Sequence, residues 1–427
     1  MRLDKVGVIV PGLEGFAFPR MVTIEQHFPR DAVGDVASEL ADQLAAAPLP
    51  DIAGKSIAIT AGSRGIPHIV DVLATAVRFL RARGAAPFVI PAMGSHGGGT
   101  AEGQAAVLTH QGISESSIGA PIRASMEVMP AARMADGTPL FCDRLAFQSD
   151  GIVVLNKIKP HSSFRGEWES GLVKMIVIGL GKRQGAEMVH GHSILEFSRV
   201  IPEAGRALLA ATPILCGVGV VENAYGDLAR VDVVMPDAIF PRERELLRHA
   251  KEIMGRLLLS EIDVLVVDEI GKNFSGTGMD PNVTGRTTSH HPGFDTIAVK
   301  TIVVRGIAPA SRGNANGIGA ADFTTLRCVN AIDFPSTYTN AITSRVSDSA
   351  RLPMILNNDR EAVALAIRGS FPAGTDRARV VRIANTKAIH TVRVSEAFLP
   401  EIAGRAEFSI HGETTPMAFD SDGHFID

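Results

Sequence analysis

Two glycine-rich segments in the first half of the chain carry side chains that could do chemistry. Ser63 and Arg64 lie in Gly-Ser-Arg-Gly, and His96 lies in Gly-Ser-His-Gly-Gly-Gly-Thr. Backbone N–H groups at a helix N-terminus suit a phosphate, and an arginine beside them can bind it with two nitrogens. An imidazole among glycines is open to a substrate and titrates near neutral pH. The alternatives are a tight turn with a surface arginine and, for a lone histidine, a satisfied buried imidazole.

A third segment begins at His161 and ends at His190. Lys174 lies in it among the apolar residues of 172–176. Burial lowers the pKa of an amine and makes it nucleophilic, although a lysine that reaches from apolar surface to solvent is the alternative. His190 follows 16 residues after Lys174, with His192 nearby as a competitor. The pair could bind a metal, but histidines two positions apart are as often surface residues. Two histidines on opposite faces of one carbon, such as His96 and His161, provide the acid–base pair that a racemase or epimerase needs.

Three further motifs give weaker signals. The Gly-x-Gly-x-x-x-Gly segment at 179–185 is one residue longer than a dinucleotide fingerprint, and it makes a nicotinamide-dependent oxidoreductase the alternative function. The segment 271–282 is rich in Gly, Asn and Asp and carries Lys272. Long polar loops in compact domains tend to be functional, so we expect Lys272 to face the substrate. His290 and His291 favour a surface loop over a metal site.

Alternating strand and helix patterns position these residues. Apolar runs predict strands at 56–60, 88–91 and 152–155, and helical spacing predicts helices at 66–82 and 101–109. A strand, a loop and a helix, repeated, indicate an open parallel sheet whose ligands bind at the carboxyl ends of the strands. The three segments that carry the candidate residues all follow such strands, so we expect them to converge.

The second half repeats this α/β pattern. Helices are predicted at 242–258 and 320–330, and strands at 264–267, 297–304, 378–384 and 389–394. Pro236 and Pro241 interrupt the periodicity, which favours a domain boundary near 236–242. We therefore expect an α/β protein of two domains, each an open, mainly parallel sheet flanked by helices. Residues 1–238 form the cofactor-binding catalytic domain, 239–427 form a C-terminal domain that closes over the site, and the active site lies in the cleft between them.

Composition excludes several classes of function. With 45% hydrophobic and 21% charged residues the chain is a well-buried globular protein, and 427 residues are more than one ordinary core holds. A net charge of −4, one Trp and two Tyr argue against nucleic acid as a partner. The three cysteines Cys142, Cys216 and Cys328 are isolated, which fits a reducing compartment. No apolar stretch approaches the ~20 residues of a membrane span. We expect a cytoplasmic protein with no membrane partner.

Taken together, these motifs resemble the lactate racemase family, the nickel-pincer-dependent racemases and epimerases of 2-hydroxy acids. That family pairs a Thr-Arg phosphate loop with a Gly-x-His loop, and here Ser63-Arg64 and Gly94-Ser95-His96 stand in their place, with 32 residues from Arg64 to His96. It then has a loop histidine, a Ser-Gly stretch that leads to a lysine, and a metal-binding histidine. His161, Ser170-Gly171 with Lys174, and His190 match these positions. The resemblance covers roughly 55–195, with a looser similarity at 268–286.

The resemblance implies a cofactor and the residues that hold it. Lys174 forms a thioamide with a nicotinic-acid-derived mononucleotide that carries nickel in a sulfur–carbon–sulfur pincer. His190 supplies the fourth nickel ligand, since imidazole suits Ni(II). Arg64 holds the cofactor phosphate together with Ser63, and Gly171 belongs to the cofactor-binding segment.

The resemblance also implies a reaction. His96 and His161 alternate as base and acid on the substrate hydroxyl while hydride leaves and returns to the substrate carbon. From its loop, Lys272 is expected to hold the substrate carboxylate or polarise its oxygen. Phe164–Glu169 lengthens the path to Lys174, and we expect Arg165 and Trp168 to shape a pocket for a different or larger 2-hydroxy acid than lactate.

The implied partners are a small 2-hydroxy acid and the cofactor-biosynthesis enzymes that mature the protein; the oligomeric state stays open. A zinc or other metal hydrolase and a non-catalytic binding or cofactor-handling protein are the remaining alternatives. Lys174 together with His190 distinguishes these functions, because a dehydrogenase needs neither residue and a hydrolase has no use for the lysine.

Overall fold

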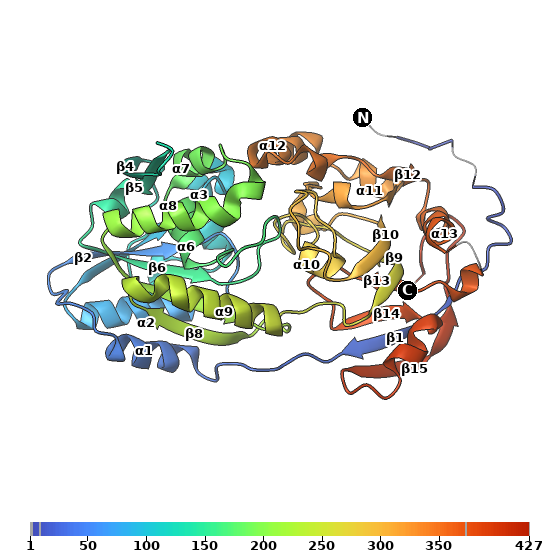
Figure 1. Ribbon diagram of the computed structural model, residues 1–427, viewed down its shortest axis with the longest axis horizontal. Helices are drawn as coiled ribbons and strands as arrows, with labels where there is room; N and C mark the ends of the chain where they lie inside the picture. Colours follow the sequence, from blue (N-terminus) through green and yellow to red (C-terminus); the bar gives the residue numbers. More distant parts are fainter. Residues whose placement is uncertain (1–2, 8–9, 372–373, 427) are drawn as a thin grey trace. The chain divides into compact units, whose positions relative to one another are not determined.

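The structure is a computed structural model that describes residues 3–7, 10–371 and 374–426, and its chain forms two compact units (Figure 1). The first unit, called the N-terminal unit below, spans Pro29–Met254. The C-terminal unit combines Met1–Phe28 with Gly255–Asp427. These ranges differ from the expected 1–238 and 239–427 at both ends of the N-terminal unit.

Long-range strand pairing explains the first difference. Strand β1 (Arg20–Gln26) pairs antiparallel with β14 (Thr391–Ser395) on one side and with β15 (Phe408–Pro416) on the other. Local periodicity carries no signal of partners more than 360 residues away. The N-terminal strand therefore belongs to the C-terminal sheet.

The second difference, a unit that ends at Met254 and not at 238, arises because a helix tolerates proline in its first turn. Pro236 begins a 3₁₀ turn, and Pro241 lies in the first turn of α9 (Ile239–Ile253). The first turn of a helix has no intrahelical acceptor for its N–H groups, so proline interrupts nothing there. The predicted helix at 242–258 thus begins three residues earlier, and the chain leaves the N-terminal unit only after α9.

The N-terminal unit is built on a five-stranded sheet of order β3-β2-β6-β7-β8, in which only the β7–β8 pair is antiparallel. Its strands are β2 (Ser56–Ala61), β3 (Ala86–Pro91), β6 (Gly151–Lys157), β7 (Ile214–Glu222) and β8 (Leu228–Val234), with a separate hairpin of β4 (Val128–Arg133) and β5 (Pro139–Asp143). Its remaining helices are α1 (Val36–Ala46), α2 (Ile69–Ala82), α3 (Ala101–His110), α4 (Glu115–Ile118), α5 (Arg144–Phe147), α6 (Leu172–Lys174), a π-helical turn (Met175–Gly179), α7 (Lys182–Val189) and α8 (Phe197–Ala211).

Both faces of this sheet are buried. Along β6, Ile152 and Val154 belong to one hydrophobic cluster, and Val153 and Leu155 belong to the other. The first cluster packs on α6 through α9, and the second packs on α1 and α2. Strands covered on both faces need continuous apolar runs, which is why β6 is so readily predicted from sequence.

The C-terminal unit contains an eight-stranded sheet of order β12-β11-β10-β9-β13-β14-β1-β15. Neighbouring strands are parallel from β12 to β13 and antiparallel from β13 to β15. Its other strands are β9 (Glu261–Val267), β10 (Ala298–Val304), β11 (Phe323–Thr325), β12 (Met354–Leu356) and β13 (Val380–Ile383), and its helices are α10 (Pro281–Thr284), α11 (Leu326–Asn330), α12 (Phe334–Ser344), α13 (Asp359–Ser370) and α14 (Leu399–Ile402). The expected fold class, α/β with mainly parallel sheets flanked by helices, is confirmed.

Some predicted helices begin later than their apolar periodicity. Helix α2 begins at Ile69 because His68 adopts a left-handed backbone conformation, with φ 57°. The predicted helix at 320–330 is a helix only from Leu326, because Phe323–Thr325 pairs as β11 beside β10. Aromatic and β-branched residues fit a pleated strand, and here that preference overrides the helical spacing.

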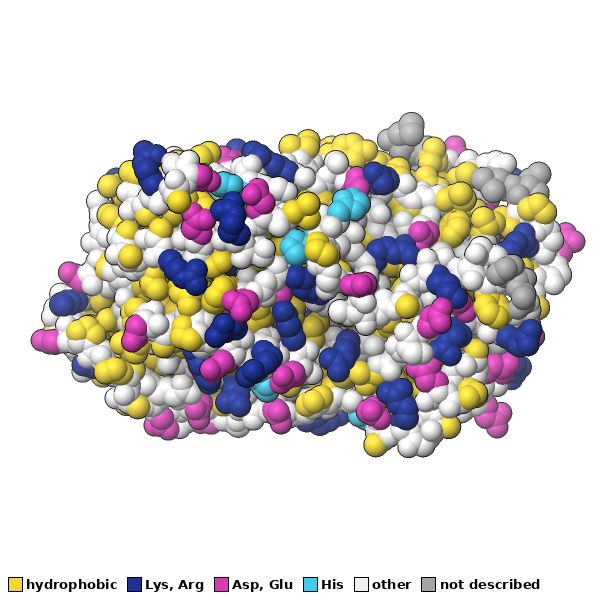
Figure 2. Space-filling model, viewed as in Figure 1, with side chains coloured by type: hydrophobic (Ala, Val, Ile, Leu, Met, Phe, Trp, Pro, Cys, Tyr) yellow, Lys and Arg dark blue, Asp and Glu magenta, His cyan; other side chains and the backbone are white. Residues whose placement is uncertain are grey.

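No helix within the described ranges is long and apolar enough to cross a lipid bilayer. The face of the molecule drawn in Figure 2 carries Lys and Arg side chains interspersed with Asp and Glu.

Candidate active site

The three candidate segments leave the same edge of the N-terminal sheet. Ser63 and Arg64 follow β2, His96 follows β3, and His161 follows β6. These strands are neighbours and run parallel, with Ala61 opposite Pro91 across β2 and β3. Their carboxyl ends therefore lie side by side, where open α/β sheets bind ligands.

The first two segments touch. Oγ of Ser63 and Nδ1 of His96 are in hydrogen-bond contact. The backbone of the His96 loop lies directly on helix α3, since a Cβ on Gly97 would stand 2.6 Å from the backbone of Gly103. Gly97, at φ 64°, has both the backbone freedom and the missing side chain that this approach requires.

The third segment brings His161 onto Lys174. Nε2 of His161 and Nζ of Lys174 are in contact, although the two residues are 13 positions apart. Burial lowers the pKa of His161 well below its usual range, and the charges of Lys174, Lys159, His190 and Arg64 lower it further. His161 is therefore neutral at pH 7. Because these charges act on His161, all four side chains lie in its neighbourhood. The spacing in sequence only suggested this.

The amine of Lys174 is prepared for chemistry. Burial lowers its pKa from 10.5 to about 7, with contributions from the positive charges of Arg64 and Lys159. Burial also lowers the pKa of the Arg64 guanidinium. An amine with a pKa near 7 is substantially unprotonated at neutral pH and can act as a nucleophile. The expectation from the sequence that apolar surroundings lower the pKa of Lys174 agrees with this shift.

Glu169 holds the loop that carries His161. Its wholly buried carboxylate accepts the backbone N–H of His161 at 2.7 Å and Nζ of Lys251 at 2.6 Å. Arg165 lies 3.6 Å from the same carboxylate and donates to the carbonyl of His161 at 3.2 Å. Arg165 thus supports the loop, in addition to the pocket-shaping role expected from the sequence. Local periodicity gives no indication of this role of Glu169, because its partner Lys251 lies 82 positions later, on α9.

Lys174 is carried by a short helix whose start is fixed from two sides. Nδ2 of Asn156, near the end of β6, donates to the carbonyl of Gly171 at 2.7 Å. The carboxylate of Glu243, on α9, accepts the N–H of Val173 at 2.8 Å. A Cβ on Gly171 would lie 2.5 Å from that carboxylate, so the glycine lets Glu243 approach this closely. Burial raises the pKa of Glu243 to about 7. Sequence reasoning missed Asn156 and Glu243.

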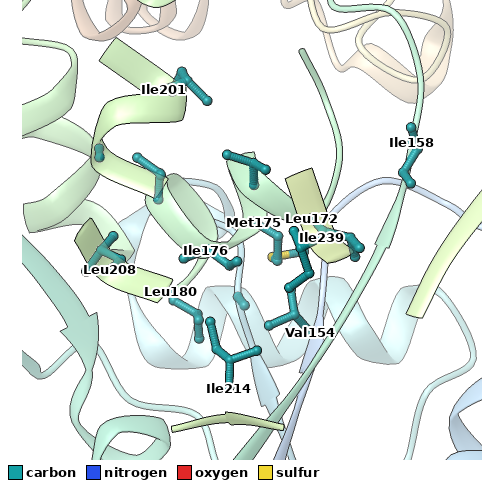
Figure 3. Packing of buried hydrophobic residues seen from close by; sticks show 14 of the residues in the cluster. Val154, Ile158, Leu172, Met175, Ile176, Leu180, Ile201, Leu208, Ile214 and Ile239 are labelled. Carbon is teal, nitrogen blue, oxygen red and sulfur yellow. The ribbon is translucent and has the colours of Figure 1, made fainter. Parts of the chain in front are cut away.

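Apolar side chains on both sides of Lys174 anchor the same helix. Leu172, Met175 and Ile176 pack in one cluster with Val154 of β6 and Ile239 of α9 (Figure 3). The helix continues beyond Lys174 as a π-helical turn, a rare geometry that is often found at functional sites. The amine is thus held by a rigid, buried element.

The two candidate metal ligands lie in different surroundings. The ring of His190 packs on Phe197, with centroids 5.1 Å apart, and Phe197 packs on Phe164, which in turn packs on His161. His192 points elsewhere, with Nε2 3.2 Å from Oγ1 of Thr138 in the β4–β5 hairpin. His190 therefore shares the neighbourhood of His161 and Lys174. Among the described residues, no group of three or more His, Cys, Asp or Glu side chains could hold a metal by itself.

Lys272 lies in the C-terminal unit, after β9. Its backbone N–H donates to Oγ of Ser311 at 2.6 Å, and its amine donates to the carbonyl of Gly276 at 2.6 Å. The N–H of Gly271 donates to the carbonyl of Gly278, which closes the segment into a compact loop. The loop is therefore ordered, and the role of Lys272 stays a prediction.

Neither of two weaker motifs gains support as a functional site. The Gly-x-Gly segment at 179–185 follows the helical residues 172–179 and not a strand, so it lacks the strand–turn–helix context of a dinucleotide fingerprint. His290 contacts Asp348 at 2.6 Å, and His291 contacts the carbonyl of Pro292.

No family model and no curated protein matches the sequence. Among solved structures, the lactate racemase apoprotein of Thermoanaerobacterium thermosaccharolyticum is similar, with 12% sequence identity over 86% of this chain and 99% of that chain and a TM-score of 0.49. A protein of Thermotoga maritima is similar over 65% of this chain and 72% of that chain, with 16% identity and a TM-score of 0.46. Similarities this remote assign no activity, so the site residues carry the proposal below.

Proposed function

We propose that the chain is a racemase or epimerase of a 2-hydroxy acid that uses a nickel-pincer nucleotide attached to Lys174. The observation that supports this most is the partly buried contact between Nζ of Lys174 and Nε2 of His161. It combines an amine whose pKa is about 7 with a neutral imidazole, and Arg64 lies close enough to influence both. Residues suited to serve as a tether, a base and a phosphate ligand thus lie together.

The residues at the site fit such a cofactor. Arg64 and Ser63 would hold its phosphate, Lys174 would form the covalent link, and imidazole from His190 is a suitable nickel ligand. The described part of the chain contains no group of three or more His, Cys, Asp or Glu side chains that could hold a metal, so nickel at His190 would take its other ligands from the cofactor. When bound, the cofactor supplies an acceptor for the hydride on the substrate carbon.

The chain's own residues would move the hydroxyl proton. One neutral histidine accepts this proton as hydride leaves the substrate carbon, and a protonated histidine on the other face returns a proton to the oxygen. The depressed pKa of His161 suits the first task, and we assign the second to His96, whose Nδ1 contacts Oγ of Ser63. In the structure the N–H of Ser163 donates to Nδ1 of His161, which places the ring proton on Nε2. For Nε2 to act as the base, this contact must be released so that the ring proton can move to Nδ1.

Lys272 would bind the substrate carboxylate, as its glycine-rich loop suggests. Dependence on cofactor-synthesis enzymes follows from the proposed cofactor, and the isolated cysteines favour a cytoplasmic location. The nicotinamide-dependent alternative loses its main motif, because 179–185 lacks a preceding strand.

The test is epimerisation in D₂O. Protein produced together with the cofactor-synthesis enzymes and nickel is given single enantiomers of a panel of 2-hydroxy acids, with Lys174→Arg as the control. We expect interconversion with the original hydrogen retained at C2, because hydride does not exchange with solvent. Deuterium at C2 would contradict hydride transfer, and no interconversion of any panel member by nickel-loaded protein would contradict the activity.

A further inference from the structure

The N-terminal unit contains a second buried lysine, at the start of α7. Lys182 is 0% exposed and has a left-handed backbone conformation, with φ 52°. Its amine lies 3.0 Å from Oδ2 of Asp143, which is also wholly buried, and it donates to the carbonyl of Pro91. A buried charge and a positive φ at a non-glycine residue are each unfavourable, and residues that combine such features cluster at functional sites.

What the amine binds suggests the reason. Pro91 ends β3, directly before the loop that carries His96. Gln104 of α3 accepts from the Lys182 amine at 3.4 Å, while its own amide donates to the carbonyls of Gly94 at 2.8 Å and His96 at 3.3 Å. Lys182 and Gln104 therefore bind the carbonyl of Pro91, where the loop begins, and the carbonyls of Gly94 and His96 within it. This loop brings the His96 ring to Ser63.

Helix α7 extends this support to the candidate metal ligand. Lys182 is its first residue, and His190 is the residue that caps its end. One rigid helix of eight residues thus connects the support of the His96 loop with His190. Asp143 completes the arrangement, since its other oxygen accepts the N–H of Ala146 and caps α5.

We infer that Lys182 is a positioning residue for His96: it fixes the loop so that the imidazole keeps its contact with Ser63. This inference deepens the proposed function, because it names a residue on which the acid–base role of His96 depends. A methionine would fill the same volume without burying a charge, but it could donate neither to the carbonyl of Pro91 nor to Gln104.

The test uses the ring nitrogens of the histidines in the full-length protein without cofactor. In the paired variant Lys182→Met/Asp143→Asn both charges are removed, and asparagine can still cap α5. We record ring ¹⁵N NMR signals, assigned with His96→Gln, and use His192, held by Thr138, as the internal reference. Loss of the Ser63 contact lets the two tautomers of His96 interconvert, so its two ring-nitrogen signals should converge while those of His192 stay unchanged.

Unchanged His96 signals would overturn the inference. Equal changes at His96 and His192 would also overturn it, because they indicate general loosening of the unit. If the paired variant does not fold, Gln104→Met leaves the ion pair intact and removes two of the loop contacts, and the same outcomes decide.

A second readout separates this inference from the proposed function. In cofactor-loaded protein the paired variant should lower kcat at least ~10-fold with KM changed less than about twofold, since misplacing an acid–base group affects the transition state. If His96 changes tautomer but kcat does not fall, the acid–base role of His96 fails and the positioning role of Lys182 stands.

Discussion

Lys174 should destabilise the cofactor-free protein in a pH-dependent way. Its pKa falls from 10.5 to about 7, which corresponds to about 4 kcal/mol of destabilisation at pH 7 when each pKa unit is worth about 1.4 kcal/mol. Because the folded state binds this proton less tightly, the cost is fully present below pH 7 and disappears as the pH rises towards 10.5. We therefore expect Lys174→Met to raise the free energy of unfolding by about 2 to 4 kcal/mol at pH 7.

The assay can follow the N-terminal unit alone. Trp168 is the only tryptophan of the chain, and its indole N–H donates to the carbonyl of Phe240 at 2.8 Å. Urea unfolding followed by Trp fluorescence at several pH values between 7 and 10.5 gives the stability difference between Lys174→Met and the unmodified chain. Lys55→Met, at an exposed lysine in the same unit, is the matched control.

The expected difference falls as the pH rises above 7, by at most about 1.4 kcal/mol per unit, and stops changing near pH 10.5. The control should show no such slope. A difference that does not vary with pH, or a Lys174→Met protein that is less stable at pH 7, would refute the argument that the amine is buried at a cost and held for function.

Three further outcomes are expected, the first two in cofactor-loaded samples and the third in the cofactor-free protein. His96→Ala and His161→Ala should each remove epimerisation while the adduct, by intact mass, and nickel, by elemental analysis, are kept; loss of metal in either variant would assign that histidine to ligation. Lys272→Ala should lower kcat/KM at least ~10-fold, which is about 1.4 kcal/mol of transition-state stabilisation, with unchanged cofactor occupancy, and wild-type kinetics would remove Lys272 from the site. Glu243→Leu should slow modification of Lys174 by an amine-reactive reagent at pH 7.5, because the N–H of Val173 loses its acceptor, whereas Glu243→Gln should restore it; equal rates in all three proteins would dismiss this support.

Much of the N-terminal unit is predictable because its strands are buried on both faces. The apolar runs at 56–60, 88–91 and 152–155 predict β2, β3 and β6 to within a few residues, and parallel order then places their loops at one edge. The candidate residues with unusual neighbours, such as Lys174 in an apolar run and His96 among glycines, are visible for the same reason. Local sequence thus indicates both the secondary structure and the residues that depart from its usual pattern.

The remaining features depend on distant partners. Strand β1 is defined by pairing with β14 and β15, and the sequence near residue 20 contains no trace of either. Glu243 looks like one more acidic residue of an amphipathic helix until its carboxylate meets the N–H of Val173, 70 positions earlier. Lys182 reads as part of a glycine motif, and only the fold brings it to Asp143. The missing information in each case is a long-range contact.

The attachment of a cofactor to Lys174 tests the account most directly. The chain and its Lys174→Arg variant are produced together with the cofactor-synthesis enzymes and nickel, and both are measured by intact mass, by peptide mapping and by elemental analysis. We predict one adduct of nucleotide mass on the peptide that contains Lys174, with one nickel per chain, and no covalent adduct on the variant. An unmodified Lys174 in protein from cells that demonstrably make the cofactor, or an equal adduct on the variant, would contradict the central claim.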